Sequence, residues 1–187
     1  MSEIARAWER IEAWYAAHDA ADRLLPGATL EQVTALEGFL GFALPAELRE
    51  SLRRHDGSPE GGWPTGTLLG TAGIQSEADT WRDLLGRGVF DDNADHDASE
   101  GRDEIRRGWW AHGWIPLDAD GAGNGAVIDT TPGPAGRAGQ VIDMDHGVGP
   151  SGPQHPTLAA YLHAIADRLD AGEFVMDAGE LIEAPST

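Results

Sequence analysis

The 187-residue sequence contains no cysteine and no lysine. Without cysteine the chain cannot form a disulfide, use a thiolate nucleophile or bind zinc through sulfur. All 13 basic residues are arginine, and 32 acidic residues oppose them, so the formal net charge is −19. Proteins that bind DNA or RNA draw most of their affinity from basic groups placed on phosphates. The composition therefore predicts no direct nucleic-acid binding.

Long apolar runs are also missing. Charged residues interrupt the first 25 positions, where a secretory signal would need a continuous apolar stretch. No later segment reaches the roughly 18 apolar residues that a membrane span requires, and the net negative charge disfavours an anionic lipid surface. We expect a cytoplasmic protein with no membrane association, and the length suits one domain.

Amphipathic periodicity predicts most of the helices. Apolar residues spaced as on one helical face, such as Ile4, Trp8 and Ile11, mark the first helix. A capping box of Thr29 with Gln32 starts the second, and Gly41 ends it. The five predicted helices cover residues 3–17, 29–41, 45–55, 76–86 and 157–171, of which the fourth is short.

Three strand-like runs follow in the second half, at residues 114–117, 126–129 and 140–144, separated by turn residues. We expect at least two of them to pair antiparallel. Residues 90–104 are almost purely acidic and predict an exposed insertion. The chain beyond Val175 is expected to be frayed, which gives a single domain over residues 1–176 and a flexible acidic tail over 177–187.

Two motifs resemble ligand-binding loops. Residues 121–126 fit the loose dinucleotide pattern G-x-G-x-x-A, but a strand rather than a helix follows, so a hairpin turn is favoured. Residues 91–97 place oxygen-bearing side chains at alternate positions of a calcium loop. His96 stands where that loop needs glycine, and Arg102 stands where it needs glutamate, so a solvated acidic loop is the better interpretation.

Catalytic patterns are weaker still. Asp143, Asp145 and His146, with His112, could supply metal ligands at the end of a strand, although ordinary turn chemistry near Gly147 explains them as well. The segment around Ser151 lacks the last glycine of a G-x-S-x-G nucleophile elbow. These patterns therefore offer no credible catalytic nucleophile, and we predict no cofactor and no metal site.

Several segments follow one another in a recognisable order and spacing: residues 36–41, 44–48, 55–57, 113–121, 124–129, 139–142, 145–146 and the final helix. In this order they resemble the bacterial SMI1/KNR4 family, also called the SUKH superfamily. The resemblance implies an α+β fold, with a central, mostly antiparallel sheet and flanking helices, and no enzyme activity. It also implies a protein-binding role, because bacterial members are regarded as immunity proteins against polymorphic toxins and fungal relatives are linked to cell-wall synthesis and cell proliferation.

From this resemblance and the charge we expect a module that neutralises a basic, nuclease-type toxin domain, as a monomer by default. The alternative is a regulatory scaffold in cell-wall synthesis or proliferation control, and a metal-dependent hydrolase using Asp143, Asp145 and His146 is a third reading. A basic partner would be steered to an anionic surface. The predicted contact residues are Asp118, Asp120, Asp143 and Asp145 at strand ends, Trp109 and Trp110 as apolar anchors, and Asp95, Asp97 and Glu100 of the acidic insertion.

Overall fold

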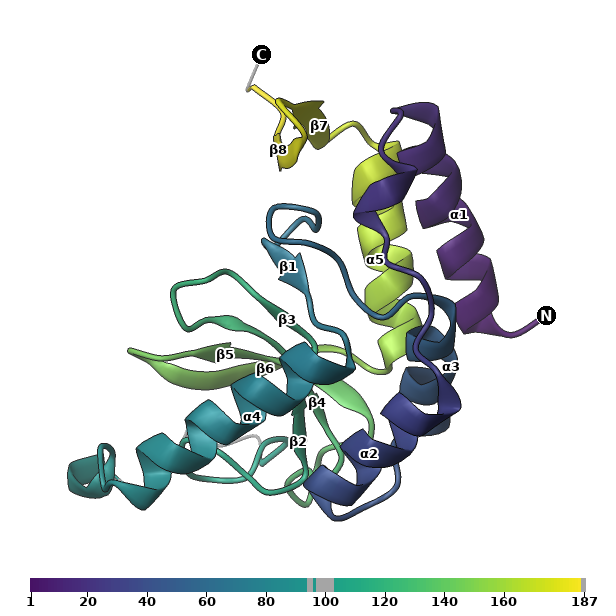
Figure 1. Cartoon of the computed structure of the whole chain (residues 1–187). Helices are drawn as coiled ribbons and strands as arrows, with labels where there is room; N and C mark the ends of the chain where they lie inside the picture. The colour runs from purple at the N-terminus through teal and green to yellow at the C-terminus, as the bar shows by residue number, and fades with distance from the viewer. Residues whose placement is uncertain (94–95, 97–102, 186–187) are drawn as a thin grey trace.

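The computed structural model of the chain describes residues 1–93, 96 and 103–185. At its centre lies a four-stranded antiparallel sheet in the order β2–β4–β5–β6, flanked by helices (Figure 1). This arrangement confirms the α+β prediction and all three predicted strands. The sheet strands are β2 (Trp114–Pro116), β4 (Gly125–Asp129), β5 (Gln140–Asp145) and β6 (Gly149–His155).

Strand β6 is the sheet strand that the sequence pattern did not predict. Its sequence, GPSGPQH, combines two glycines with two prolines, residue types that are depleted in strands. The strand lies at the edge of the sheet, beside β5 alone. An edge strand tolerates proline, because backbone N–H groups on its outer side have no partner strand to bond with. A residue without an N–H therefore costs no ladder hydrogen bond there.

The predicted helices are all present, but one begins earlier than expected. The fourth, α4, starts at Thr71 rather than at Ser76. The observed helices are α1 (Glu3–Ala17), α2 (Leu30–Leu40), α3 (Ala46–Arg54), α4 (Thr71–Gly86) and α5 (Leu158–Asp170), with short 3₁₀ turns η1 (Ala21–Arg23) and η2 (Asp91–Asn93).

The early start of α4 depends on a cap from a distant residue. Gly70 has no side chain to cap the helix, and Asp56 serves instead: its carboxylate accepts hydrogen bonds from the Thr71 backbone N–H at 2.5 Å and the Thr71 hydroxyl at 3.1 Å. A Cβ on Gly70 would lie 2.1 Å from the Asp56 carbonyl oxygen. A local capping signal therefore could not reveal this helix start.

Removing this cap should weaken the helix measurably. We expect Asp56→Ala to lower the free energy of unfolding by about 1–2 kcal/mol, the usual range for losing an N-terminal cap. Urea denaturation of the variant and the parent chain measures the difference. Asp56→Asn keeps an acceptor oxygen and should lose less than Asp56→Ala; equal losses would show that capping is not the reason.

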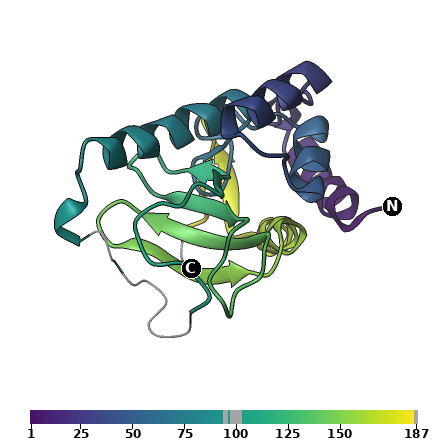
Figure 2. The same cartoon turned by 90° about the horizontal axis from the view of Figure 1, so that it is seen from below.

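The sheet separates two groups of packed side chains, because alternate residues of each strand point to opposite faces. Val141 of β5 and Ile128 of β4 belong to the main core, which α1 and α5 also build. Ile142 and Val127 belong to a second cluster with Trp81 of α4. Figure 2 shows α2 and α4 in one row above the sheet and α5 end-on beside it.

The segment after α5 is ordered into a hairpin. Strands β7 (Phe174–Asp177) and β8 (Glu180–Glu183) pair antiparallel, and the Leu181 N–H donates to the Gly61 carbonyl oxygen at 2.8 Å. In place of the frayed chain expected beyond Val175, the structure therefore has a hairpin that reaches Glu183. The remaining small sheet joins β1 (Thr67–Leu68) to β3 (Asp118–Ala119).

The acidic insertion is described only in part. Asp91–Asn93 form η2, while Asp95, Asp97 and Glu100 lie outside the described residues. After the insertion, Ile105 is buried in the second cluster. Of the described residues in the segment 90–104, Asp91–Asn93 and Asp103 are exposed, whereas Phe90, His96 and Glu104 are half-buried.

Candidate functional site: an acidic cavity on the sheet

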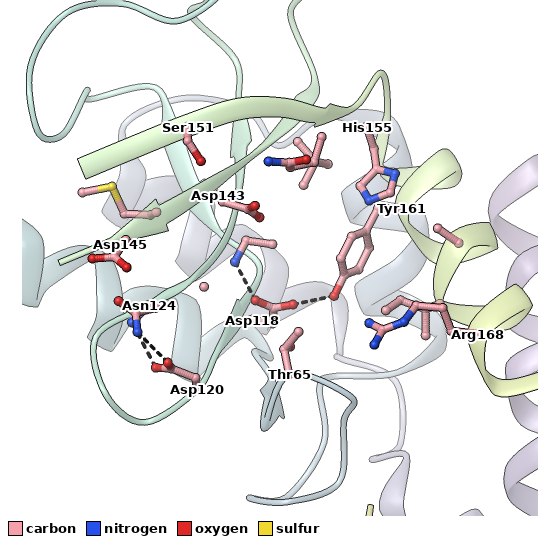
Figure 3. A pocket seen from close by; sticks show the side chains of 17 residues that line it. Thr65, Asp118, Asp120, Asn124, Asp143, Asp145, Ser151, His155, Tyr161 and Arg168 are labelled. Carbon is pink, nitrogen blue, oxygen red and sulfur yellow. Dashed lines mark hydrogen bonds between the residues drawn. The ribbon is translucent and has the colours of Figure 1, made fainter. Parts of the chain in front are cut away.

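A cavity of about 640 Å³ opens between α5, the β3–β4 turn and the outer half of the sheet (Figure 3). It brings together four of the predicted contact residues, Asp118, Asp120, Asp143 and Asp145. They come from three segments separated by up to 27 positions in the chain. Its other polar lining residues are Thr65, Asn124, Ser151, Gln154, His155, Tyr161 and Arg168.

The sequence of β5 and its neighbours explains why the sheet is hollow here. Asp143 pairs across the sheet with Ala126 on one side and Ser151 on the other, both of which have short side chains. Helix α5 covers Val141 on the same face and presents small Ala164 to the cavity. Neither the strands nor the helix therefore fills the space above Asp143.

Asp118 forms the floor of the cavity and is only 2% exposed. Its carboxylate accepts hydrogen bonds from the Ala126 backbone N–H at 2.6 Å and from the Tyr161 hydroxyl at 2.5 Å. Burial raises the pKa of Asp118, and these hydrogen bonds only partly oppose that effect. Asp118 is thus held at the cavity floor by buried hydrogen bonds, and its predicted contact with a partner stays a prediction.

The hydrogen bonds continue from Asp118 into the main core. The Trp63 indole N–H donates to the Tyr161 hydroxyl oxygen at 2.8 Å. Burial raises the pKa of Tyr161 well above its usual value, and the charge of Asp118 adds to the effect. Trp63 also packs against Trp8 of α1, with ring centroids 5.8 Å apart. The cavity floor is therefore tied to the helical layer.

Asp120 shapes the turn between β3 and β4. Its carboxylate accepts hydrogen bonds from the Ala122 N–H at 2.7 Å and from the Asn124 N–H at 3.0 Å. Burial alone would raise the pKa of Asp120, but hydrogen bonds from Asn124 and Ala122 outweigh it and lower the pKa. The turn confirms the hairpin interpretation of the glycine-rich segment, and Gly125 is needed there because a Cβ would lie 2.1 Å from the Asp118 carbonyl oxygen.

Asp145 has a similar local role in the next turn. One of its carboxylate oxygens accepts hydrogen bonds from the Gly147 N–H at 2.7 Å and the Val148 N–H at 2.9 Å. The His146 ring nitrogen lies 3.1 Å from the Asn124 side-chain oxygen. The turn interpretation of Asp145 and His146 is therefore confirmed.

Asp143 differs from the other three aspartates because no backbone turn uses its carboxylate. Its side chain points into the cavity (Figure 3). Asp143 is exposed, but partial desolvation by the cavity walls raises its pKa, the nearby Asp118 charge raises it further, and a hydrogen bond from Gln154 opposes both. Across the cavity, the Arg168 guanidinium donates to the Glu173 carboxylate at 2.7 Å. Arg168 is thus already paired with a residue outside the cavity lining.

The predicted tryptophan anchors lie elsewhere. Trp109 is 8% exposed, and its indole N–H donates to the Asn93 carbonyl oxygen at 3.0 Å. Trp110 is half-buried and stacks on Trp81, with ring centroids 5.1 Å apart. Both pack in the second cluster on the α4 side of the sheet. Trp109 is therefore largely buried, and its predicted role as a docking anchor stays a prediction.

The metal-site alternative finds no support in the arrangement of side chains. Among residues 1–93, 96 and 103–185, no three histidine or acidic side chains are grouped to hold an ion. His112 packs edge-on against Phe42, with ring centroids 5.6 Å apart, and is not among the residues that line the cavity with Asp143.

In the same described part of the chain, no helix is long and apolar enough to cross a membrane.

The other half of the cavity could not be predicted from the sequence pattern. Tyr161 falls within the helix predicted over residues 157–171 with no sign of its role, although a tyrosine hydroxyl in a buried position requires a hydrogen-bond partner. Thr65 and His155 come from segments with no periodic pattern. Spacing along the chain gives no signal that they meet, because their proximity is created by the β1–β3 pairing and the α5 packing.

Comparison with known proteins identifies the family. The model of the SMI1/KNR4 family (SUKH-1) matches residues 27–164, which include most of the cavity lining. The chain belongs to the SMI1/KNR4 family. It is 32% identical over 189 aligned residues to the Schizosaccharomyces pombe "Cell wall biosynthesis/cell cycle regulator smi1", with 93% of this chain and 38% of the relative covered.

Two further relatives are named for a regulatory role or for the family. The chain is 27% identical over 211 aligned residues to the Neurospora crassa "Glucan synthesis regulatory protein", with 93% of this chain and 40% of the relative covered. It is 29% identical over 224 residues to a Yarrowia lipolytica "KNR4/SMI1 homolog", with coverages of 93% and 31%. The chain therefore spans about two fifths or less of the length of these relatives.

Proposed function

We propose that this chain is a non-enzymatic, protein-binding module that regulates cell-wall synthesis, and that it binds its partner at the acidic cavity. The names of the fungal relatives support the regulatory role. They favour the regulatory alternative of the sequence analysis over toxin immunity, because none of these names refers to a toxin or to immunity. The location of the binding site is inferred from the cavity, because Asp143 presents its carboxylate there.

The chemistry of the cavity supports binding rather than catalysis. The Tyr161 hydroxyl already donates to Asp118 and accepts from Trp63, so it is held in place by both neighbours. Asp120 and Asp145 are engaged by the backbone N–H groups of their own turns. A rigid, preorganised cavity lowers the ordering penalty of binding a partner, and the net charge of −19 steers basic partners toward it.

The experiment is affinity capture of the tagged chain from its source cells, with three forms compared. We expect the parent chain and an Asp79→Arg control to retain a protein that acts in cell-wall synthesis, and Asp143→Arg to lose it. Asp79 is an exposed residue of α4 outside the cavity lining, so it controls for the change in net charge. Retention of the catalytic domain of a secreted toxin would instead support immunity, and capture by Asp143→Arg would place the binding site elsewhere.

A further inference from the structure

We propose that the cavity receives a single arginine side chain of the partner, whose guanidinium pairs with Asp143 and whose aliphatic stem lies along the apolar wall. This inference rests on the proposed binding function and specifies the chemistry of its site. Four observations on the cavity support it.

The first observation is the charge of the lining. Four aspartates line the cavity, against one arginine that already donates to Glu173. His155 does not change this balance at neutral pH, because burial lowers the pKa of its imidazole. A cationic group would therefore enter a site where carboxylates lack a matching cation among the lining residues.

The second observation is the availability of acceptors. Backbone N–H groups already donate hydrogen bonds to the carboxylates of Asp118, Asp120 and Asp145, as described above. Asp143 is the carboxylate that a ligand can use without breaking a turn. The Ser151 hydroxyl lies directly across the strand pair from Asp143 and offers a further acceptor oxygen.

The third observation is the apolar and aromatic part of the cavity lining. Val141 and Ile165 contribute apolar surface to the same cavity, which the Tyr161 and His155 rings also line. Those two rings meet edge to face, with centroids 5.6 Å apart. Arginine suits such a site better than lysine, because its planar fork pairs with a carboxylate through two hydrogen bonds and stacks on aromatic faces.

The fourth observation excludes the main alternative for peptide binding. A peptide could add a strand to the exposed edge of β6, but Pro150 and Pro153 of β6 have no backbone N–H to donate. This edge is therefore poorly suited to pairing with a partner strand. Recognition at this end of the sheet must rely on side chains entering the cavity.

The test uses three small probes on the full chain labelled with ¹⁵N: the peptide acetyl-Gly-Arg-Gly-amide, its lysine counterpart and its citrulline counterpart. We expect the arginine peptide to shift the Ala126 amide and the Trp63 indole signals saturably, with the lysine peptide weaker and the citrulline peptide inactive. Asp143→Asn should weaken arginine-peptide binding at least tenfold, and Asp79→Asn should leave it unchanged. A full set of dispersed amide signals from both free variants would confirm that each is folded.

Several outcomes would overturn the inference. They are equal or tighter binding of the lysine or citrulline peptide, shifts confined to residues that neither line the cavity nor hydrogen-bond to its lining, or unaltered binding by Asp143→Asn. If the captured partner requires Asp143 but the arginine peptide does not bind, the arginine inference fails and the proposed function stands. If the peptide binds through Asp143 but partner capture does not depend on this residue, the proposed function fails and the arginine site stands.

Discussion

Replacing Trp63 by alanine is expected to lower the free energy of unfolding by about 3–5 kcal/mol, the range for truncating a buried aromatic side chain. Trp63 is 0% exposed, packs against Trp8 and donates to the Tyr161 hydroxyl. The substitution removes this volume between the helical layer and the cavity floor, and it deprives Tyr161 of one hydrogen-bond partner. Urea denaturation followed by circular dichroism gives the difference.

A conservative variant separates volume from hydrogen bonding at this position. Trp63→Phe keeps most of the ring and loses the indole N–H, so we expect a smaller loss of about 1–2 kcal/mol. Trp110→Ala, at a half-buried tryptophan of the other cluster, is the control for losing an indole outside the core. A loss below about 1 kcal/mol for Trp63→Ala would contradict the packing described above.

Asp118→Lys is expected to destabilise the fold by more than about 3 kcal/mol, the scale of an uncompensated buried charge. The Ala126 N–H and the Tyr161 hydroxyl both donate to the Asp118 carboxylate. An ammonium group is also a donor, so it would face these two groups with no acceptor between them. Thermal unfolding measures the effect, and a melting temperature equal to that of the parent chain would show that Asp118 is not buried as described.

Asp118→Asn tests the effect of the Asp118 charge. The quantity compared is the free energy of unfolding of the variant and the parent chain as pH changes. Because burial raises the pKa of Asp118 in the folded state, the folded chain holds this proton more tightly than the unfolded chain does. The resulting stability is present below the unfolded pKa and is lost as pH rises through the folded pKa. Asp118→Asn cannot lose it, so the variant should gain stability relative to the parent chain as pH rises above the usual pKa of an aspartate.

The pH comparison requires the difference between two curves. Glu12 contributes with the opposite sign, since hydrogen bonds from Arg54 lower its pKa against the effect of burial, and its contribution is lost on acidification. Such groups are common to both chains and cancel in the difference. Chemical denaturation at several pH values supplies the data, and a flat or falling difference would contradict the raised pKa of Asp118.

Periodicity predicted those elements whose signals are local. The stripe of Ile4, Trp8 and Ile11 specifies a helix face by spacing alone, and the capping box of Thr29 and Gln32 lies within one turn. The start of α4 could not be predicted in this way, because its cap comes from Asp56, far back in the chain. The hairpin after Val175 is also set by tertiary contact, with Leu181 bonded to Gly61.

The candidate site shows the same division. Aspartates at strand ends are a local pattern, and the four chosen from it do meet in one cavity. Their separate roles depend on burial and on neighbours from other elements: Asp118 lies beneath Tyr161 of α5, whereas Asp143 points into open space. The pattern of one strand carries no information about which carboxylate a helix will cover.

The most direct test of the account is a double-mutant cycle between Asp143 and an arginine of the captured partner. Affinities are measured by calorimetry for the parent pair, for Asp143→Asn, for the partner arginine replaced by alanine, and for both changes together. If a partner arginine pairs with Asp143, the coupling energy should be about 1.5 kcal/mol or more, as for close charge pairs across an interface. A coupling near zero for every arginine of the partner would contradict it.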